Sequence, residues 1–144
     1  MTTLDVLFPV FAQVTLTFAL MFAMASSRLS ALRRKEVRMA DIALGQSNWP
    51  SRTTQISNAF NNQFELPVLF YVVIGLAIVT GQVTLALVAL AWMFVVFRVL
   101  HAFVHTGSNF VRHRFYAFAA SGFTLIAMWI VFAVNVIVAA SSGT

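Results

Sequence analysis

Residues 66–97 read LPVLFYVVIGLAIVTGQVTLALVALAWMFVVF and contain no charged side chain. Two apolar runs of equal length, 66–80 and 83–97, flank the dipeptide Gly81-Gln82. A helix that is apolar on all sides is typical of a membrane span, and glycine beside a polar residue is a turn signal. This stretch therefore predicts two membrane-spanning helices that are joined by a tight turn.

The rest of the chain holds two further apolar segments. Of the 144 residues, 60% are apolar and only 9% are charged, and the mean hydropathy is +0.89. A transmembrane helix needs about 20 mostly apolar residues, so four such helices with short connections occupy nearly the whole length. We predict an all-α integral membrane protein with a single domain, a bundle of four transmembrane helices at about 4–27, 54–80, 83–105 and 110–139.

The basic residues form two clusters that flank the ends of apolar runs. Loops rich in Lys and Arg stay in the cytoplasm, whereas the N-terminus, the Gly81-Gln82 turn and the C-terminal tail carry neither residue. We therefore expect a protein of the inner (cytoplasmic) membrane with both termini outside and both basic loops cytoplasmic. The net charge of +5 reflects this topology, and we expect no nucleic-acid partner.

The second predicted helix carries a polar face at its inner end. Asn58, Asn62 and Glu65 stand at positions i, i+4 and i+7, which share one face of an α-helix. Pro67 follows, and proline both lacks an N–H and clashes with the carbonyl group four residues earlier, here that of Gln63. We expect a kink or a free carbonyl group beside Glu65.

The third predicted helix carries Arg98, His101 and His105 on one face, at i, i+3 and i+7. An ionisable group inside a membrane helix usually pairs with another group or faces a wet cavity, and it is a functional-site candidate by default. Glu65 and Arg98 could form an ion pair that only joins two helices. Because six polar side chains exceed what one such contact needs, we favour a binding site.

A metal site is the weaker interpretation of these residues. His101 and His105 could bind a metal with Glu65 as third ligand, but paired histidines at i and i+4 are a weak signal without a surrounding motif, and we predict none. The chain has no cysteine, which excludes disulfides and thiolate metal sites. Any thiol chemistry must use a thiol that a ligand brings in.

Two short motifs resemble those of a known family. Residues 62–67, NQFELP, look like the Asn-x-x-Glu followed by Pro in the second helix of the MAPEG family, the membrane-associated proteins in eicosanoid and glutathione metabolism. Residues 98–101, RVLH, with His105 one turn later and Arg112 or Arg114 at the start of the next helix, resemble the family's second signature. The resemblance covers almost the full chain and indicates a bacterial-type member.

The resemblance implies a homotrimer of four-helix subunits that binds glutathione, as co-substrate, between neighbouring subunits in the cytoplasmic half of the membrane. Asn62 and Glu65 would hold the peptide part of glutathione, and Arg98 would contact a carboxylate. One of Arg112 and Arg114 would be the catalytic residue that stabilises the thiolate. The implied glutathione-binding set also includes Asn58, His101, His105 and Tyr116.

The chain departs from the family pattern at two of these positions. His105 stands where many members have Tyr, and Asn58 stands where an Arg is common. The second helix therefore offers fewer cations than catalytic members have.

Three functions are open at this point. The first is a glutathione-dependent transferase or peroxidase that acts on lipophilic electrophiles or lipid peroxides within the lipid bilayer. The second is a non-catalytic MAPEG-like accessory or interaction subunit of a membrane complex. The third is a small transporter that uses Glu65, which the scarcity of polar residues in the outer half disfavours. We favour the first, an enzyme with an apolar small-molecule substrate, because glutathione needs cations, a carboxylate and amides close together.

Overall fold

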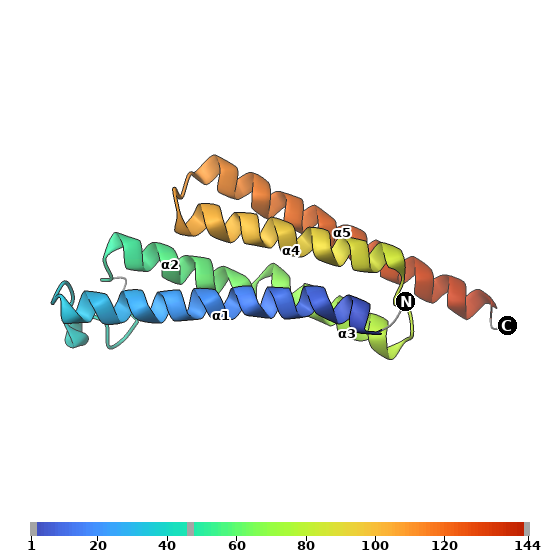
Figure 1. Cartoon of the computed structure of the whole chain (residues 1–144), viewed down its shortest axis with the longest axis horizontal. Helices are drawn as coiled ribbons and strands as arrows, with labels where there is room; N and C mark the ends of the chain where they lie inside the picture. The colour runs from blue at the N-terminus through green and yellow to red at the C-terminus, as the bar shows by residue number, and fades with distance from the viewer. Residues whose placement is uncertain (1–2, 46–47, 143–144) are drawn as a thin grey trace.

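The computed structural model describes residues 3–45 and 48–142. These residues contain four helical segments that are long and apolar enough to cross a membrane, and the segments lie side by side as a bundle (Figure 1). The chain is therefore an all-α integral membrane protein with a four-helix bundle, as its sequence predicts. Its elements are α1 (Thr3–Arg33), η1 (Met39–Asp41), α2 (Ser51–Asn61), η2 (Asn62–Phe64), α3 (Leu66–Val79), α4 (Leu85–Thr106) and α5 (Val111–Ser142).

The observed helices extend beyond the predicted bounds at their polar ends. α1 continues to Arg33 and not only to residue 27, and α5 continues to Ser142 and not only to residue 139. Long basic side chains reach water from a helical backbone, so a change to polar composition does not by itself end a helix. α1 ends where Lys35 adopts a positive φ of 58° and the N–H of Glu36 donates back to the carbonyl oxygen of Ala31 at 3.0 Å.

The second membrane crossing is interrupted. The predicted helix 54–80 is divided into α2, the 3₁₀ turn η2, and α3. Glu65 lies between η2 and α3 with φ −98° and ψ −106°, and Pro67 lies in the first turn of α3, where its missing N–H is tolerated. The kink expected beside Glu65 is therefore present, and it takes the form of a tight turn.

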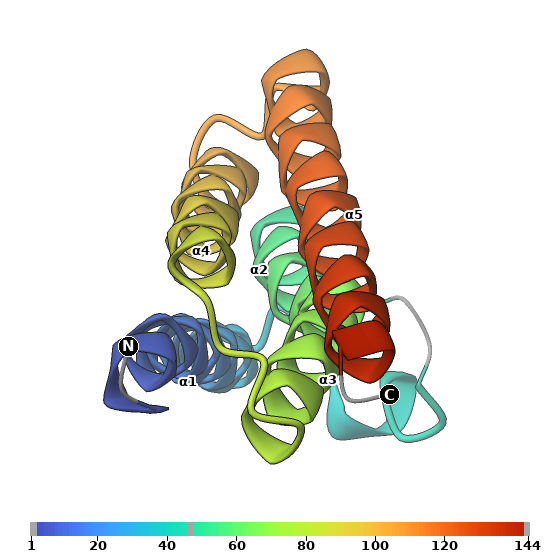
Figure 2. The same ribbon diagram turned by 90° about the vertical axis from the view of Figure 1, so that its right-hand side faces the viewer.

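Helices α4 and α5 pack against each other as an antiparallel pair, and α1 lies beside α2 and α3 (Figures 1 and 2). The connections after α1 and after α4 lie at one end of the bundle. The α3–α4 turn lies at the other end, where α1 begins and where α5 extends past the other helices (Figure 1). Both basic clusters are thus brought to the same end of the molecule.

The connection that follows α1 is held by its own ion pair. Arg38 donates from Nε and Nη2 to the two carboxylate oxygens of Asp41, at 2.9 and 3.0 Å. This side-chain hydrogen bonding holds the pKa of the Asp41 carboxyl group below its ordinary value. The negative charge of Asp41 thus offsets one positive charge of this connection.

The apolar core fills the end of the bundle away from the basic connections. Phe70 of α3 and Phe94 of α4 are fully buried and stacked, with ring centroids 4.7 Å apart. Large apolar side chains also cover the outer surface of α1, among them Phe8 and Phe22, which are more than half exposed. Such a surface needs lipid as its solvent.

Polar side chains of α2 join it to the end of α4. Gln55 donates from Nε2 to the carbonyl oxygens of His105 and Gly107, at 2.7 and 3.1 Å. Arg52 donates to the carbonyl oxygen of Thr106. The last carbonyl groups of a helix have no partner within it, so α2 caps α4. This contact brings the polar parts of α2 and α4 together.

Candidate functional site

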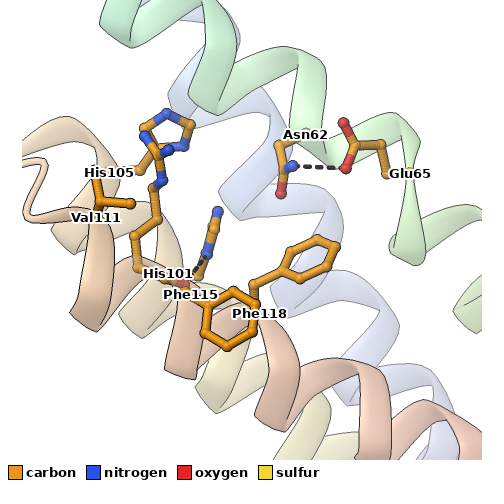
Figure 3. A pocket seen from close by; sticks show the side chains of 8 residues that line it. Asn62, Glu65, His101, His105, Val111, Phe115 and Phe118 are labelled. Carbon is orange, nitrogen blue, oxygen red and sulfur yellow. Dashed lines mark hydrogen bonds between the residues drawn. The ribbon is translucent and has the colours of Figure 1, made fainter.

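A polar pocket of about 260 Å³ lies where η2, α4 and the start of α5 meet (Figure 3). It combines a carboxylate, a guanidinium, two imidazoles and an amide with apolar side chains of α5. These residues are Asn62, Glu65, His101, His105 and Arg114, with Val111, Phe115 and Phe118. The pocket gathers residues from both sequence motifs.

Asn62 connects the buried cation to the carboxylate. Arg98 is fully buried, and its Nη2 donates to the backbone carbonyl oxygen and to the Oδ1 of Asn62, at 2.8 and 2.7 Å. The Nδ2 of Asn62 donates in turn to Oε2 of Glu65 at 2.7 Å, the contact drawn in Figure 3. Hydrogen bonds therefore hold both the oxygen and the nitrogen of the Asn62 side-chain amide.

The ion pair considered for Glu65 and Arg98 is not formed. The ion pairs between described side chains join other residues, and Asn62 stands between these two. Arg98 lies behind Asn62 and is not among the side chains that line the pocket. Its Nε and Nη1 have no hydrogen-bond partner within the described part of the chain. The charge of Glu65 therefore acts on Arg98 across Asn62 and not through a direct contact.

The two histidines lie on the α4 side of the pocket. Nδ1 of His101 contacts the backbone carbonyl oxygen of Arg114 at 3.1 Å. Because a carbonyl oxygen only accepts, Nδ1 carries the proton, and the neutral ring keeps Nε2 as an acceptor. The rings of His101 and His105 meet edge to face at 5.4 Å. Within residues 3–45 and 48–142, no group of three metal-ligating side chains lies close enough to hold a metal.

The structure separates Arg112 from Arg114. Arg114 is half-buried and lines the pocket, and its Nη1 donates to Oδ1 of Asn109 at 2.7 Å. Arg112 is exposed, donates to the hydroxyl group of Tyr116 at 3.3 Å and lies over its ring. Arg112 and Tyr116 therefore lie on a different face of α5, outside the pocket of this chain.

Asn58 also lies outside the pocket. It lines another cavity of about 280 Å³, together with Asn61, Arg28 and Trp49. The N–H of Asn62 still donates to the carbonyl oxygen of Asn58, so α-helical spacing holds between these two residues, and the interruption comes only before Glu65. The two asparagines therefore follow one helical face but line different cavities.

An apolar groove continues from the pocket along α5. Phe115 and Phe118 also line a hollow of about 230 Å³, which shares Gly122 and Ile126 with a groove of about 520 Å³ between α3 and α5. Trp129 lies further along that groove. Sequence reasoning missed these residues, since apolar side chains that line a groove show the same pattern as those that face lipid. The small side chains at 119 and 122 were the available signal.

Comparisons with known proteins identify the family of the chain. No curated protein and no solved structure was found to match the chain. The model of the MAPEG family matches residues 6–134, which is nearly the whole length and includes every residue that lines the polar pocket. The chain therefore belongs to the MAPEG family.

Proposed function

We propose that this protein is a glutathione-dependent transferase or peroxidase that acts on lipophilic electrophiles or lipid peroxides within the membrane. The MAPEG family includes glutathione transferases. The observation that carries the proposal is a polar pocket with groups of both charges that shares Phe115 and Phe118 with an adjoining apolar hollow. A hydrophilic thiol and a lipophilic acceptor can meet at the boundary, beside Phe115 and Phe118.

The pocket offers complementary groups for glutathione, which carries two carboxylates, one ammonium group and a thiol. Glu65 is an acceptor for the ammonium group, and Arg114 is a cation for a carboxylate or the thiolate. The buried charge of Arg98 adds a positive field behind Asn62.

The chemistry needs no protein nucleophile. A guanidinium group close to the thiol favours the thiolate form, which is the reactive one. In a transferase step, the thiolate sulfur bonds to the electrophilic carbon, and the displaced group leaves with the electron pair of its bond. In a peroxidase step, the thiolate attacks the terminal peroxide oxygen, the O–O bond breaks, and the alkoxide leaves with the electron pair and takes a proton to become the alcohol, while the sulfur becomes a sulfenic acid. A second glutathione then reduces the oxidised sulfur to give the disulfide and water.

We also propose a homotrimer in the inner membrane, with the polar pocket toward the cytoplasm. The family resemblance and the exposure of the lining residues Glu65, Val111 and Phe115 support a neighbouring subunit that completes the site. Mass measurement in mild detergent tests the assembly. A clean monomer or dimer contradicts this part of the proposal.

Calorimetry with glutathione and purified protein in lipid nanodiscs tests the proposed function. We expect binding at or below millimolar concentration and conjugation of glutathione to a lipophilic electrophile. Binding without conjugation or peroxide reduction would support a non-catalytic accessory subunit. Absence of binding at millimolar glutathione contradicts the proposal.

A further inference from the structure

A buried pair of glutamine side chains joins α1 to the turn that carries the site. Gln13 of α1 and Gln63 of η2 are 0% and 2% exposed. Nε2 of Gln13 donates to Oε1 of Gln63 at 2.9 Å, and Nε2 of Gln63 donates to the carbonyl oxygen of Ala59 at 3.2 Å. Neither glutamine is among the side chains that line the polar pocket.

Holding two membrane helices together through these glutamines costs more free energy than an apolar contact would. Oε1 of Gln13 is buried without a hydrogen-bond partner among the described residues. An unsatisfied polar atom is costly in an apolar interior, whereas two apolar side chains of similar size would pack there without that cost. Stability alone therefore does not explain why glutamine stands at both positions.

The position of Gln63 suggests a different role. It lies between Asn62 and Glu65 in a segment that belongs to neither α2 nor α3. Its side chain contacts α1, whereas Asn62 contacts Arg98 of α4. Side-chain contacts with α1 and with α4 therefore hold the turn. The contact with α1 lies wholly outside the pocket.

We propose that Gln13 is a positioning residue of the ligand site. Through Gln63 it holds η2 in the place where Asn62 can bond both Arg98 and Glu65. The ligand in this inference is glutathione, so that part rests on the proposed function. The effect on the turn itself does not depend on any ligand.

A distance measurement tests the effect on the turn. The chain has no cysteine, so spin labels can be attached through Phe64→Cys on η2 and Phe103→Cys on α4, which are 60% and 77% exposed. In lipid nanodiscs, we expect Gln13→Leu to broaden or shift the distance distribution. The matched control is Thr15→Val, since the exposed Thr15 hydroxyl donates within α1, to the carbonyl oxygen of Phe11 at 2.8 Å. A Gln13→Leu distribution equal to that of the control would overturn the proposal.

Binding and heat stability separate positioning from a merely structural role. We expect Gln13→Leu to weaken glutathione binding about tenfold. The double variant Gln13→Leu/Gln63→Leu leaves neither amide unsatisfied, so its Tm should equal or exceed that of the unchanged chain while its affinity stays as low as that of the single variant. Recovery of affinity together with stability would overturn the proposal. If the unchanged chain binds no glutathione, the proposed function fails, and the distance measurement alone decides the role of Gln13.

Discussion

Arg98 carries a full positive charge in the protein interior, and its bonded partner is an amide. Replacing Arg98 with Ala removes two charge-assisted hydrogen bonds to Asn62 and the charge behind the pocket. Hydrogen bonds to charged groups are worth about 1.5–3 kcal/mol, so their loss should lower the free energy of unfolding by about this amount. Because Asn62 is then no longer held and the positive field is gone, we also expect glutathione affinity to fall by about one order of magnitude. Calorimetry measures the loss, with the exposed Arg112→Ala as control. Equal affinity in both variants would argue against a role for the buried charge.

Arg112 and Arg114 are close in sequence but have different surroundings. Arg114 lines the pocket, whereas Arg112 bonds Tyr116 outside it. Arg114→Leu should therefore lower the thiolate fraction of bound glutathione at neutral pH and move the activity profile to higher pH, because a thiol without a nearby cation loses its proton less readily. Arg112→Leu should leave both unchanged. Thiolate absorbance across pH reads out the effect, and the opposite pattern would assign the role to Arg112.

At the scale of elements, the turn between α2 and α3 decides how the polar residues are arranged. Restoring the N–H through Pro67→Ala favours a continuous helix through this region. We expect higher helix content by circular dichroism and weaker glutathione binding, because Asn62 and Glu65 are carried away from Arg98. Val68→Ala, at the next, exposed position of α3, is the matched control since it adds no N–H. Unchanged helix content and binding for Pro67→Ala would show that the turn does not depend on proline.

The same turn explains which parts of the site were predictable. Pro67 and the polar spacing predicted an interruption beside Glu65, and the residues of α4 kept the spacing of an unbroken helix. Asn58 keeps its helical spacing from Asn62 but lines a different cavity, which residue spacing alone does not show. The direct contact between Glu65 and Arg98, an alternative that the sequence left open, is not formed. Whether Asn62 reaches between them depends on backbone geometry that residue spacing does not contain.

The sequence also did not predict which residues of different helices contact each other. Gln13 lies far from the motifs along the chain, and its contact with Gln63 depends on how α1 crosses η2. The four spans themselves were predictable because the need to bury about 20 apolar residues in lipid acts on each segment separately. Tertiary contacts between spans carry no such local signature.

At the scale of the whole molecule, the two basic connections share one end of the bundle. The positive-inside rule then predicts that this end faces the cytoplasm. Cysteine introduced at Leu44, 87% exposed in the first connection, should react with an impermeant reagent only after permeabilisation. Cysteine introduced at the exposed Thr80, beside the opposite turn, should react in intact cells. The reverse pattern would invert the orientation.

The length of α5 links the site to the thickness of the surrounding bilayer. α5 carries no charged side chain from residue 115 to its end at residue 142, which is 28 residues or about 42 Å at 1.5 Å per residue, against a hydrocarbon core of about 30 Å. The last turns of α5 still expose Val134 and Ile137. A helix with such hydrophobic mismatch tilts or thickens the lipid around it. Since α5 also forms one wall of the apolar groove, its tilt would alter the groove's width, and lipid composition would thereby influence which acceptors reach the thiol.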